Sequence, residues 1–302
     1  MWFIGSGYTS EAEHIAKCIV ETVCIGSVNA FVLISGWFGI RSGMSKIGDL
    51  AFMISFCTLP LLMVALIFGW MSINDLKSLT GIYEYVLGGN NYWFVVDYIG
   101  LLIIAPLLNN GIKSFDKKQF ATTLIAGYIL IGVYDFIFRT PVIGTEGGYS
   151  LVWFVYLYLL ARYLKIHRIE RMEKYRWTLL ISAVIFQSIL FYYGYIGLRY
   201  TNPFIVIEAV CLIEIFKTWN FKSKTVNYAA KGALMAYLIH MQPVLIPYIA
   251  RFLLVEYYRF GYFLYMVEVI VLAILIFVAA IPLNQLQSSN YHKLKSLFKK
   301  KC

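Results

Sequence analysis

The polar side chains that could do chemistry in this sequence stand inside long apolar runs. His240 lies in the middle of one run, and Glu208 follows the Asn202-Pro203 pair inside another. An imidazole titrates near pH 6.5 and can take a proton from a hydroxyl, so His240 is the candidate base of a group transfer. A charged carboxyl at mid-bilayer costs at least about 2.5–3.5 kcal/mol, so Glu208 needs a partner, a wet cavity or a function. The alternative for His240 is a hydrogen-bonded core residue without a catalytic role.

Three further polar residues, Asn29, Ser35 and Asn109, interrupt apolar runs and could contact a hydroxyl-bearing ligand. Arg41 and Lys46 follow the first of these runs and could bind phosphate groups at the mouth of a polar chamber. Each set also has a structural interpretation. Small residues such as Asn29 and Ser35 serve helix packing in membranes, and Arg41 and Lys46 fit the bias toward positive cytoplasmic helix ends.

The composition limits which elements can position these residues. The chain has 302 residues, of which 60% are hydrophobic and 14% are charged, against about 45–50% and 25% in soluble domains. A soluble enzyme, a disordered chain and a disulfide scaffold are therefore excluded. The five cysteines form no Cys-x-x-Cys pair, so we expect no metal site. Despite a net charge of +10, the basic residues punctuate apolar runs, which indicates membrane lipid as a partner and no nucleic acid.

Nine stretches are long and apolar enough to cross a bilayer, which takes about 20 residues of helix. They are residues 18–40, 50–73, 93–110, 120–138, 149–164, 177–198, 202–217, 231–250 and 262–283. Backbone groups in hydrocarbon must pair within their own segment, and the alternating pattern of a barrel is absent, so helices are expected. The sequence predicts an all-α, polytopic membrane helix bundle.

Basic residues are distributed unequally between alternate loops. Twenty of the 26 Lys and Arg fall in one set of loops and the C-terminal tail, and six fall in the other set. Because positive residues favour the cytoplasmic side, the richer set and the C-terminus are expected in the cytoplasm. Nine spans then put the N-terminus outside, although the chain starts without a secretory signal. A missing first span, giving ten spans in a full-length protein, is the simpler arrangement.

No linker is long enough to separate two domains, so residues 1–302 are expected to form one membrane domain with a short basic cytoplasmic tail at about 285–302. The loop 162–176 is also basic. Both segments are expected to lie on anionic lipid, with residues 290–302 forming a short helix. The alternative is a dock for a polyanionic cytosolic cosubstrate.

Four strings in this sequence resemble motifs of the integral-membrane acyltransferase family (acyltransferase type 3), especially its bacterial sugar O-acetyltransferase branch. They are residues 28–38 (VNAFVLISGWF), residues 92–109 from Tyr92-Trp93-Phe94 to Pro106-Leu107-Leu108-Asn109, residues 148–164 ending in ARYL, and Asn202-Pro203 together with Tyr237-Leu238-Ile239-His240. Their order and spacing follow the family pattern. The Arg and His of the family's first span have no counterpart here, and Met1–Gly7 resembles the stretch just after that span.

The resemblance implies a ten-span enzyme of the bacterial inner membrane. Such an enzyme moves an acyl group, usually acetyl from cytosolic acetyl-CoA, onto a sugar hydroxyl of an envelope glycan or its lipid-linked precursor. His240 would be the catalytic residue, and Arg41 and Lys46 would contact the cosubstrate. The substrate contacts would be Asn29, Ser35, Trp93, Asn109, Asn202 and Glu208.

A second hypothesis needs no catalysis. Helices interrupted by proline and isolated acidic residues are also typical of secondary transporters, so a transporter or glycan flippase is the alternative. A recognisable repeated half, which many transporters have, is absent from the sequence.

Overall fold

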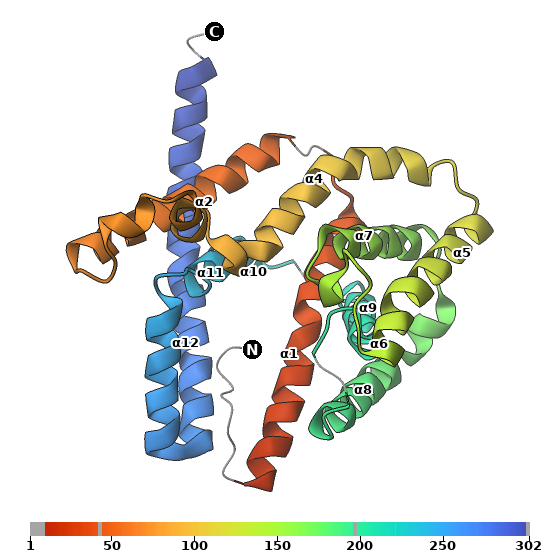
Figure 1. The fold of residues 1–302 in the computed structure, drawn as a ribbon. Helices are drawn as coiled ribbons and strands as arrows, with labels where there is room; N and C mark the ends of the chain where they lie inside the picture. Colours follow the sequence, from red (N-terminus) through yellow and green to blue (C-terminus); the bar gives the residue numbers. More distant parts are fainter. Residues whose placement is uncertain (1–9, 42–43, 196–197, 221, 300–302) are drawn as a thin grey trace. The chain divides into compact units, whose positions relative to one another are not determined.

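The computed structural model describes residues 10–41, 44–195, 198–220 and 222–299, and all regular elements among them are helical (Figure 1). The α-helices are α1 (Glu11–Phe38), α2 (Met44–Ile67), α3 (Leu79–Gly81), α4 (Trp93–Ile112), α5 (Lys117–Tyr128), α6 (Tyr134–Phe138), α7 (Leu151–Ile166), α8 (Glu170–Tyr192), α9 (Pro203–Phe216), α10 (Lys224–Ala230), α11 (Ala233–His240) and α12 (Ile246–Lys299). Short 3₁₀ or π turns are η1 (Ile73–Leu76), η2 (Ile82–Val86), η3 (Gly89–Tyr92), η4 (Ile129–Val133) and η5 (Glu146–Gly148). The all-helical fold expected from the sequence is confirmed.

Six of the described helical segments are long and apolar enough to span a membrane, so the expected count of nine is not confirmed. They are Glu11–Phe38, Lys46–Ile67, Gly89–Ile112, Lys117–Phe138, Glu170–Tyr192 and Gly261–Ser296. The stretches 149–164 and 202–217 form helices of only 16 and 14 residues, α7 and α9. The stretch 231–250 is broken between α11 and α12. The long apolar helices fit a multi-pass membrane protein.

The break between α11 and α12 has a local cause. Pro243 has no backbone N–H and cannot continue α11, which ends at His240. Gln242 is fully buried, and its Oε1 accepts hydrogen bonds from the N–H groups of Val244, at 2.5 Å, and Leu245, at 3.2 Å. These bonds satisfy donors that precede the first turn of α12, so the helix can restart inside an apolar environment.

The chain folds into two compact units that interleave in sequence. The first, which we call the α1 unit, holds the described residues of 10–44 and 95–220, and the second, the α12 unit, holds 45–94 and 222–299. Helix α4 begins in the α12 unit and continues in the α1 unit. Neither unit is a continuous stretch of sequence, so composition shifts along the chain cannot reveal them.

The α1 unit is built around α1, which packs against α7, α8 and α9. Gly36 lies where α1 meets α7: a Cβ on this residue would lie 2.7 Å from the Cβ of Ala161 and 2.7 Å from the carbonyl oxygen of Tyr158. The absent side chain therefore lets the two helix backbones approach closely, which is a common way of packing helices in lipid.

We expect Gly36→Leu to lower the free energy of unfolding by about 1–3 kcal/mol, because the new side chain overlaps α7 and forces it away. Gly111→Leu in α4 is the matched control, since no atom lies within 4 Å of a Cβ there. Thermal unfolding of both variants in detergent measures the difference. Equal melting temperatures for the two variants would contradict the close approach of α1 and α7.

In the α12 unit, α12 reverses direction at Gly261, and its two arms lie side by side in Figure 1. Gly261 has φ 78° and ψ 176°, a conformation that is essentially restricted to glycine. Tyr257 and Tyr265 hold the arms together, with ring centroids 5.4 Å apart in a buried cluster with Leu253. The expected basic tail is not a separate short helix, because α12 continues to Lys299; residues 300–302 of that tail, and Met1–Gly7, lie outside the described residues.

Candidate functional site

His240 is the last residue of α11, and its ring is partly buried. Its Nδ1 lies 2.9 Å from the carbonyl oxygen of Ala236. A carbonyl oxygen can only accept a hydrogen bond, so Nδ1 carries the proton and donates it. The other ring nitrogen, Nε2, then keeps its lone pair. This arrangement fixes the tautomer in which His240 can take a proton from a substrate.

Tyr237 links His240 to an aromatic cluster in the α12 unit. The ring of Tyr237 lies 5.7 Å from the ring of His240 and 5.7 Å from that of Phe94. Trp93 contacts Phe94 edge to face, with a centroid distance of 5.9 Å. The structure therefore brings His240 and Trp93, which the sequence separates by more than a hundred residues, into one cluster.

Two hydrogen bonds tie α11 to the turn before α4. The Tyr237 hydroxyl donates to the carbonyl oxygen of Asn91, and the Tyr92 hydroxyl donates to that of Leu238, each at 2.7 Å. Tyr92 is fully buried. These two tyrosines position the histidine. Both stand in strings that resemble the family motifs, Tyr92-Trp93-Phe94 and Tyr237-Leu238-Ile239-His240, but neither was expected to belong to the site. Only the fold shows that Tyr92 contacts α11.

Asn29 joins three parts of the α1 unit. It has an exposed fraction of 0%. Its Nδ2 donates to the carbonyl oxygen of Tyr200 at 2.8 Å, and its Oδ1 accepts from the indole Nε1 of Trp153 at 3.1 Å. Both ends of the amide are thus engaged with protein. Substrate contact by Asn29 stays a prediction, and in this conformation the side chain connects α1, α7 and the loop before α9.

Asn109 and Ser35 also connect helices. The Nδ2 of Asn109 donates to the carbonyl oxygen of Ile40 at 2.8 Å, and its Oδ1 accepts from the hydroxyl of Tyr158 at 2.8 Å. The Ser35 hydroxyl lies 3.2 Å from the Tyr98 hydroxyl. Asn109 thereby fixes the chain just after α1 against α4 and α7, and Ser35 links α1 to α4.

Glu208 lies within α9 and Asn202 caps the same helix, but the two residues have different surroundings. Glu208 is 3% exposed and faces Gly26 of α1, where an added Cβ would lie 2.6 Å from its carboxyl carbon. The missing side chain of Gly26 thus makes room for the carboxyl. Asn202 caps α9, accepting from the N–H of Phe204 at 2.9 Å, and lines a polar cavity. The structure does not bring Asn202 and Glu208 together in that cavity.

The residues expected to contact the cosubstrate, Arg41 and Lys46, are both exposed. Arg41 belongs to the α1 unit and Lys46 to the α12 unit. Among the described residues neither side chain has an ion-pair partner. The structure instead gathers basic residues elsewhere in the α1 unit.

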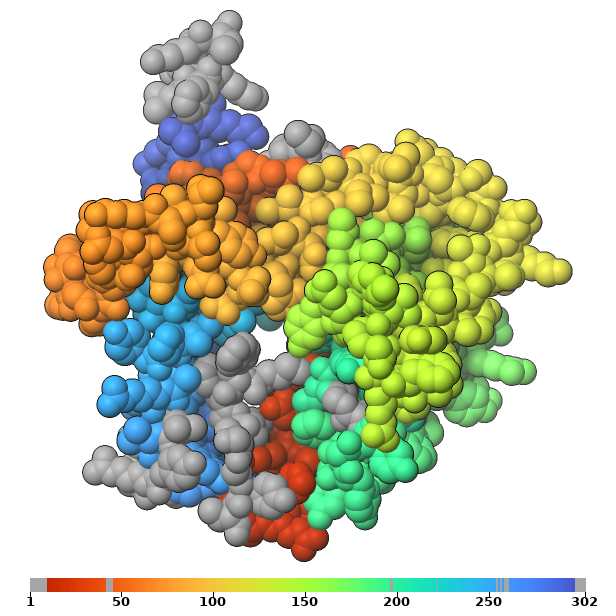
Figure 2. Space-filling model, in the orientation of Figure 1, coloured from red at the N-terminus to blue at the C-terminus, as the bar shows by residue number. Residues whose placement is uncertain are grey.

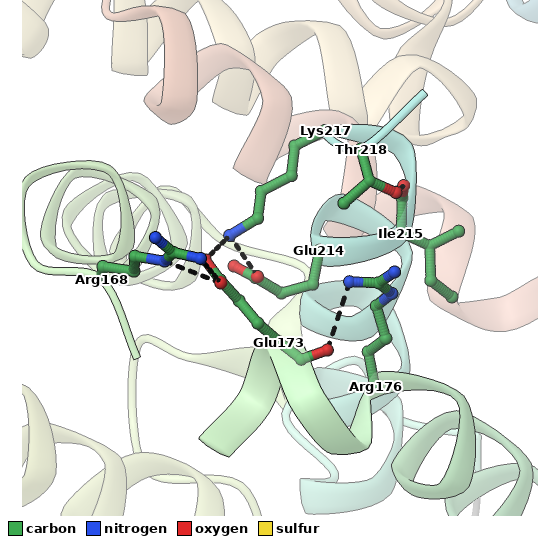
Figure 3. Close-up of polar contacts among 7 residues, drawn as sticks. All are labelled: Arg168, Glu173, Arg176, Glu214, Ile215, Lys217 and Thr218. Atoms are coloured by element: carbon green, nitrogen blue, oxygen red, sulfur yellow. Dashed lines mark hydrogen bonds and ion pairs between the residues drawn. The ribbon is translucent and has the colours of Figure 1, made fainter. Parts of the chain in front are cut away.

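This basic cluster is built on the carboxylate of Glu173, at the start of α8 (Figure 3). Arg168 donates to that carboxylate through Nε at 2.7 Å, and Lys217 donates through Nζ at 2.6 Å. Lys217 also pairs with Glu214, and Arg176 donates to the backbone carbonyl of Glu173 at 3.2 Å. The hydrogen bond and charge of Glu173 raise the pKa of the exposed Arg168. With three cations and two carboxylates, the cluster keeps a net positive charge.

Trp37, at the end of α1, extends the basic cluster. The ammonium groups of Lys165 and Lys217 lie 4.6 and 5.7 Å from the centre of its ring. The side chain of Arg162 lies nearby, because its Nη1 is 3.2 Å from the position of a Cβ on Gly39. An aromatic ring bordered by several cations suits a ligand that combines a flat base with phosphates. Most of these cations come from residues 162–176, which were expected to form a loop and instead form the end of α7, a short connection and the start of α8. A dock for a polyanionic cosubstrate at this segment stays a prediction.

Comparisons with known proteins identify no relative of this chain. No protein-family model matches it, and neither the curated proteins nor the solved structures contain a match. The resemblance to membrane acyltransferases stays a prediction from the four sequence strings.

Proposed function

We propose that this protein is a membrane-bound O-acyltransferase. It moves an acyl group, most simply acetyl, from cytosolic acyl-CoA to a sugar hydroxyl of a cell-envelope glycan or lipid-linked precursor. The observation that carries the proposal is the hydrogen bond from His240 Nδ1 to the carbonyl of Ala236, which leaves Nε2 free as a base. The neighbouring aromatic rings, including Trp93 and Tyr237, suit the apolar faces of a sugar.

The proposed step is an acyl transfer with His240 as general base. Nε2 takes the proton of the sugar hydroxyl while the hydroxyl oxygen attacks the thioester carbonyl carbon. The new C–O bond forms, the C–S bond breaks, and the electron pair leaves with the coenzyme A sulfur. His240 then returns the proton to that thiolate. A base held in the correct tautomer contributes about 10²–10⁴-fold to such a step.

The basic cluster supports the proposed donor. Coenzyme A carries an adenine ring and several phosphates. The cluster offers the ring of Trp37 with Lys165 and Lys217 beside it, and Arg168 shares the carboxylate of Glu173 with Lys217. These residues belong to the loop set that the positive-inside rule assigns to the cytoplasm. The proposal therefore includes a bacterial inner membrane with the C-terminus and the donor on the cytoplasmic side.

The alternative is a secondary transporter or glycan flippase. The break between α11 and α12 at Pro243, capped by Gln242, favours it, because transporters use broken helices at their binding sites. A carrier would move the glycan without modifying it, so the two functions differ in their products.

The proposal is tested by incubating membranes that contain the full chain with labelled acetyl-CoA. We expect label in the glycan, and we expect Lys165→Ala to raise the KM for acetyl-CoA about tenfold, because a phosphate contact is lost. Lys222→Ala is the control, since Lys222 is exposed on the same proposed side but outside the cluster. Glycan counterflow without label transfer would establish the carrier instead.

A further inference from the structure

We infer that the polar cavity of the α1 unit binds one sugar residue that carries an anionic group, either a carboxylate or a phosphate. The inference deepens the proposed function by naming an acidic sugar residue of the acceptor glycan, distinct from the residue whose hydroxyl reacts at His240, and it rests on that function. The cavity holds about 230 Å³. Its lining includes Asp135, Arg139, Tyr195, Arg199, Thr201 and Asn202. Pockets for drug-sized ligands take roughly 300–1,000 Å³, so this cavity suits a single small unit.

Two segments far apart in sequence form the cavity. One runs from α6 to Arg139, and the other comprises residues 194–195 and 199–202 between α8 and α9. Their yellow-green and teal atoms adjoin on the face shown in Figure 2. Asp135 holds them together: it is 3% exposed, pairs with Arg199 and accepts from the Thr201 hydroxyl at 2.5 Å. Both carboxylate oxygens of Asp135 are thus engaged by residues in the wall of the cavity.

Arg199 is held in place by two contacts, but not all of its N–H donors are used. It pairs with Asp135 through Nη1, and its Nη2 donates to the carbonyl oxygen of Arg139 at 3.0 Å. A guanidinium has five N–H donors, so further donors remain for a ligand. The side chain keeps 37% of its surface exposed. Arg199 is therefore a pre-oriented donor at the wall of the cavity.

Arg139 supplies the uncompensated charge. Its guanidinium carbon lies 4.8 Å from the ring centre of Tyr195, and no described carboxylate pairs with it. Its backbone has φ 54°, the left-handed conformation with which α6 ends, so its side chain leaves the helix at the wall of the cavity. With Arg199 and Asp135, the cavity has two positive charges and one negative charge. A bound group should therefore be anionic.

The remaining lining suits a sugar rather than a bare anion. The ring of Tyr195 is 60% exposed and offers a flat face. Asn202 uses its Oδ1 for the cap of α9, while its Nδ2 makes no hydrogen bond with a described residue and can donate to a hydroxyl. A ring bearing hydroxyls and one acidic group matches these donors.

The cavity and the basic cluster lie at opposite ends of α9. Asn202 caps its first turn and Lys217 follows its last residue. Its 14 residues separate these ends by about 21 Å. Arg139 and Arg199 belong to the loop set assigned to the outside, where an envelope glycan is found. The donor cluster and the acceptor cavity thus face opposite sides of the proposed membrane.

The test is calorimetric titration of the purified full chain in lipid nanodiscs, without an acyl donor. The probes are methyl glucuronide, glucose 6-phosphate, methyl glucoside and inorganic phosphate. We expect one or both acidic sugars to bind about tenfold more tightly than the neutral glucoside and than inorganic phosphate. The acidic sugar that binds identifies the anionic group as carboxylate or phosphate.

Arg139→Gln should lower that affinity about tenfold, and Arg139→Lys should keep part of it. Arg251→Gln, which alters an exposed arginine of the α12 unit, should leave it unchanged. Equal binding of the neutral glucoside, equal binding of inorganic phosphate, or no loss in Arg139→Gln with unchanged thermal unfolding would each overturn the inference. Binding of an acidic sugar without any acetyl transfer would support the acidic-sugar site and contradict the proposed acyltransferase function. Acetyl transfer without such binding would support the function and contradict the site.

Discussion

His240→Ala is expected to lower the rate of acetyl transfer by at least about tenfold, because it removes the base that takes the hydroxyl proton. The remaining activity would come from binding and orientation alone. The variant should still insert into the membrane, since the only described hydrogen bond of this side chain goes to a carbonyl within its own helix. Transfer of label from acetyl-CoA to glycan, at equal amounts of membrane protein, measures the effect.

The matched control is His292→Ala, the same substitution at an exposed histidine of α12. It should transfer label at the normal rate. His240→Gln separates chemistry from packing, because glutamine can keep a hydrogen bond to the Ala236 carbonyl but cannot act as a base. Unchanged transfer in both His240 variants would reduce His240 to a packing residue.

Asn29→Ala is expected to have the largest effect on stability, a loss of roughly 2–4 kcal/mol in the free energy of unfolding. The carbonyl of Tyr200 and the indole N–H of Trp153 would both lose a buried partner, and each such loss costs about 1–3 kcal/mol. No water is expected to replace the amide, because Asn29 is completely buried. Thermal unfolding in detergent, followed by Trp fluorescence, measures the change.

Ser35→Ala on the same helix is the control for Asn29. Its hydroxyl can also bond to the carbonyl of Phe31 within the helix, so its loss should cost about 1 kcal/mol or less. If Asn29→Ala unfolds normally but loses acetyl transfer, Asn29 contacts substrate as the sequence predicted. If Asn29→Ala instead lowers the free energy of unfolding, the result would assign Asn29 to the packing of α1.

Composition was enough to predict the fold class, but not the number of spans. A stretch such as 149–164 is as apolar as a span, yet α7 is only 16 residues long. Whether so short a helix crosses a bilayer depends on its neighbours, which hydropathy does not describe. The stretch 231–250 was expected as one span, although Pro243 weakens a helix locally, and the structure breaks it there. The buried cap by Gln242 could not be predicted, because it depends on the new direction of the chain.

Only the parts of the candidate site that lie within one segment of the chain could be predicted from the sequence. His240 stood out as an ionisable residue in an apolar run, and its bond to Ala236 stays within one helix. The basic cluster joins Trp37 to Lys165 and Lys217, which are far apart in the sequence. Arg41 and Lys46 were chosen because they follow the first apolar run, and their contact with a cosubstrate stays a prediction.

The directions in which the side chains of the second arm of α12 point depend on the reversal at one residue, Gly261. Because the reversal uses one residue and no spacer, adding one amino acid beside it would rotate everything downstream by about 100°. Tyr265 would swing away from Tyr257, and another stripe of that arm would turn toward lipid. Changes of length there are far less tolerable than changes of side chain in the exposed stripes of either arm.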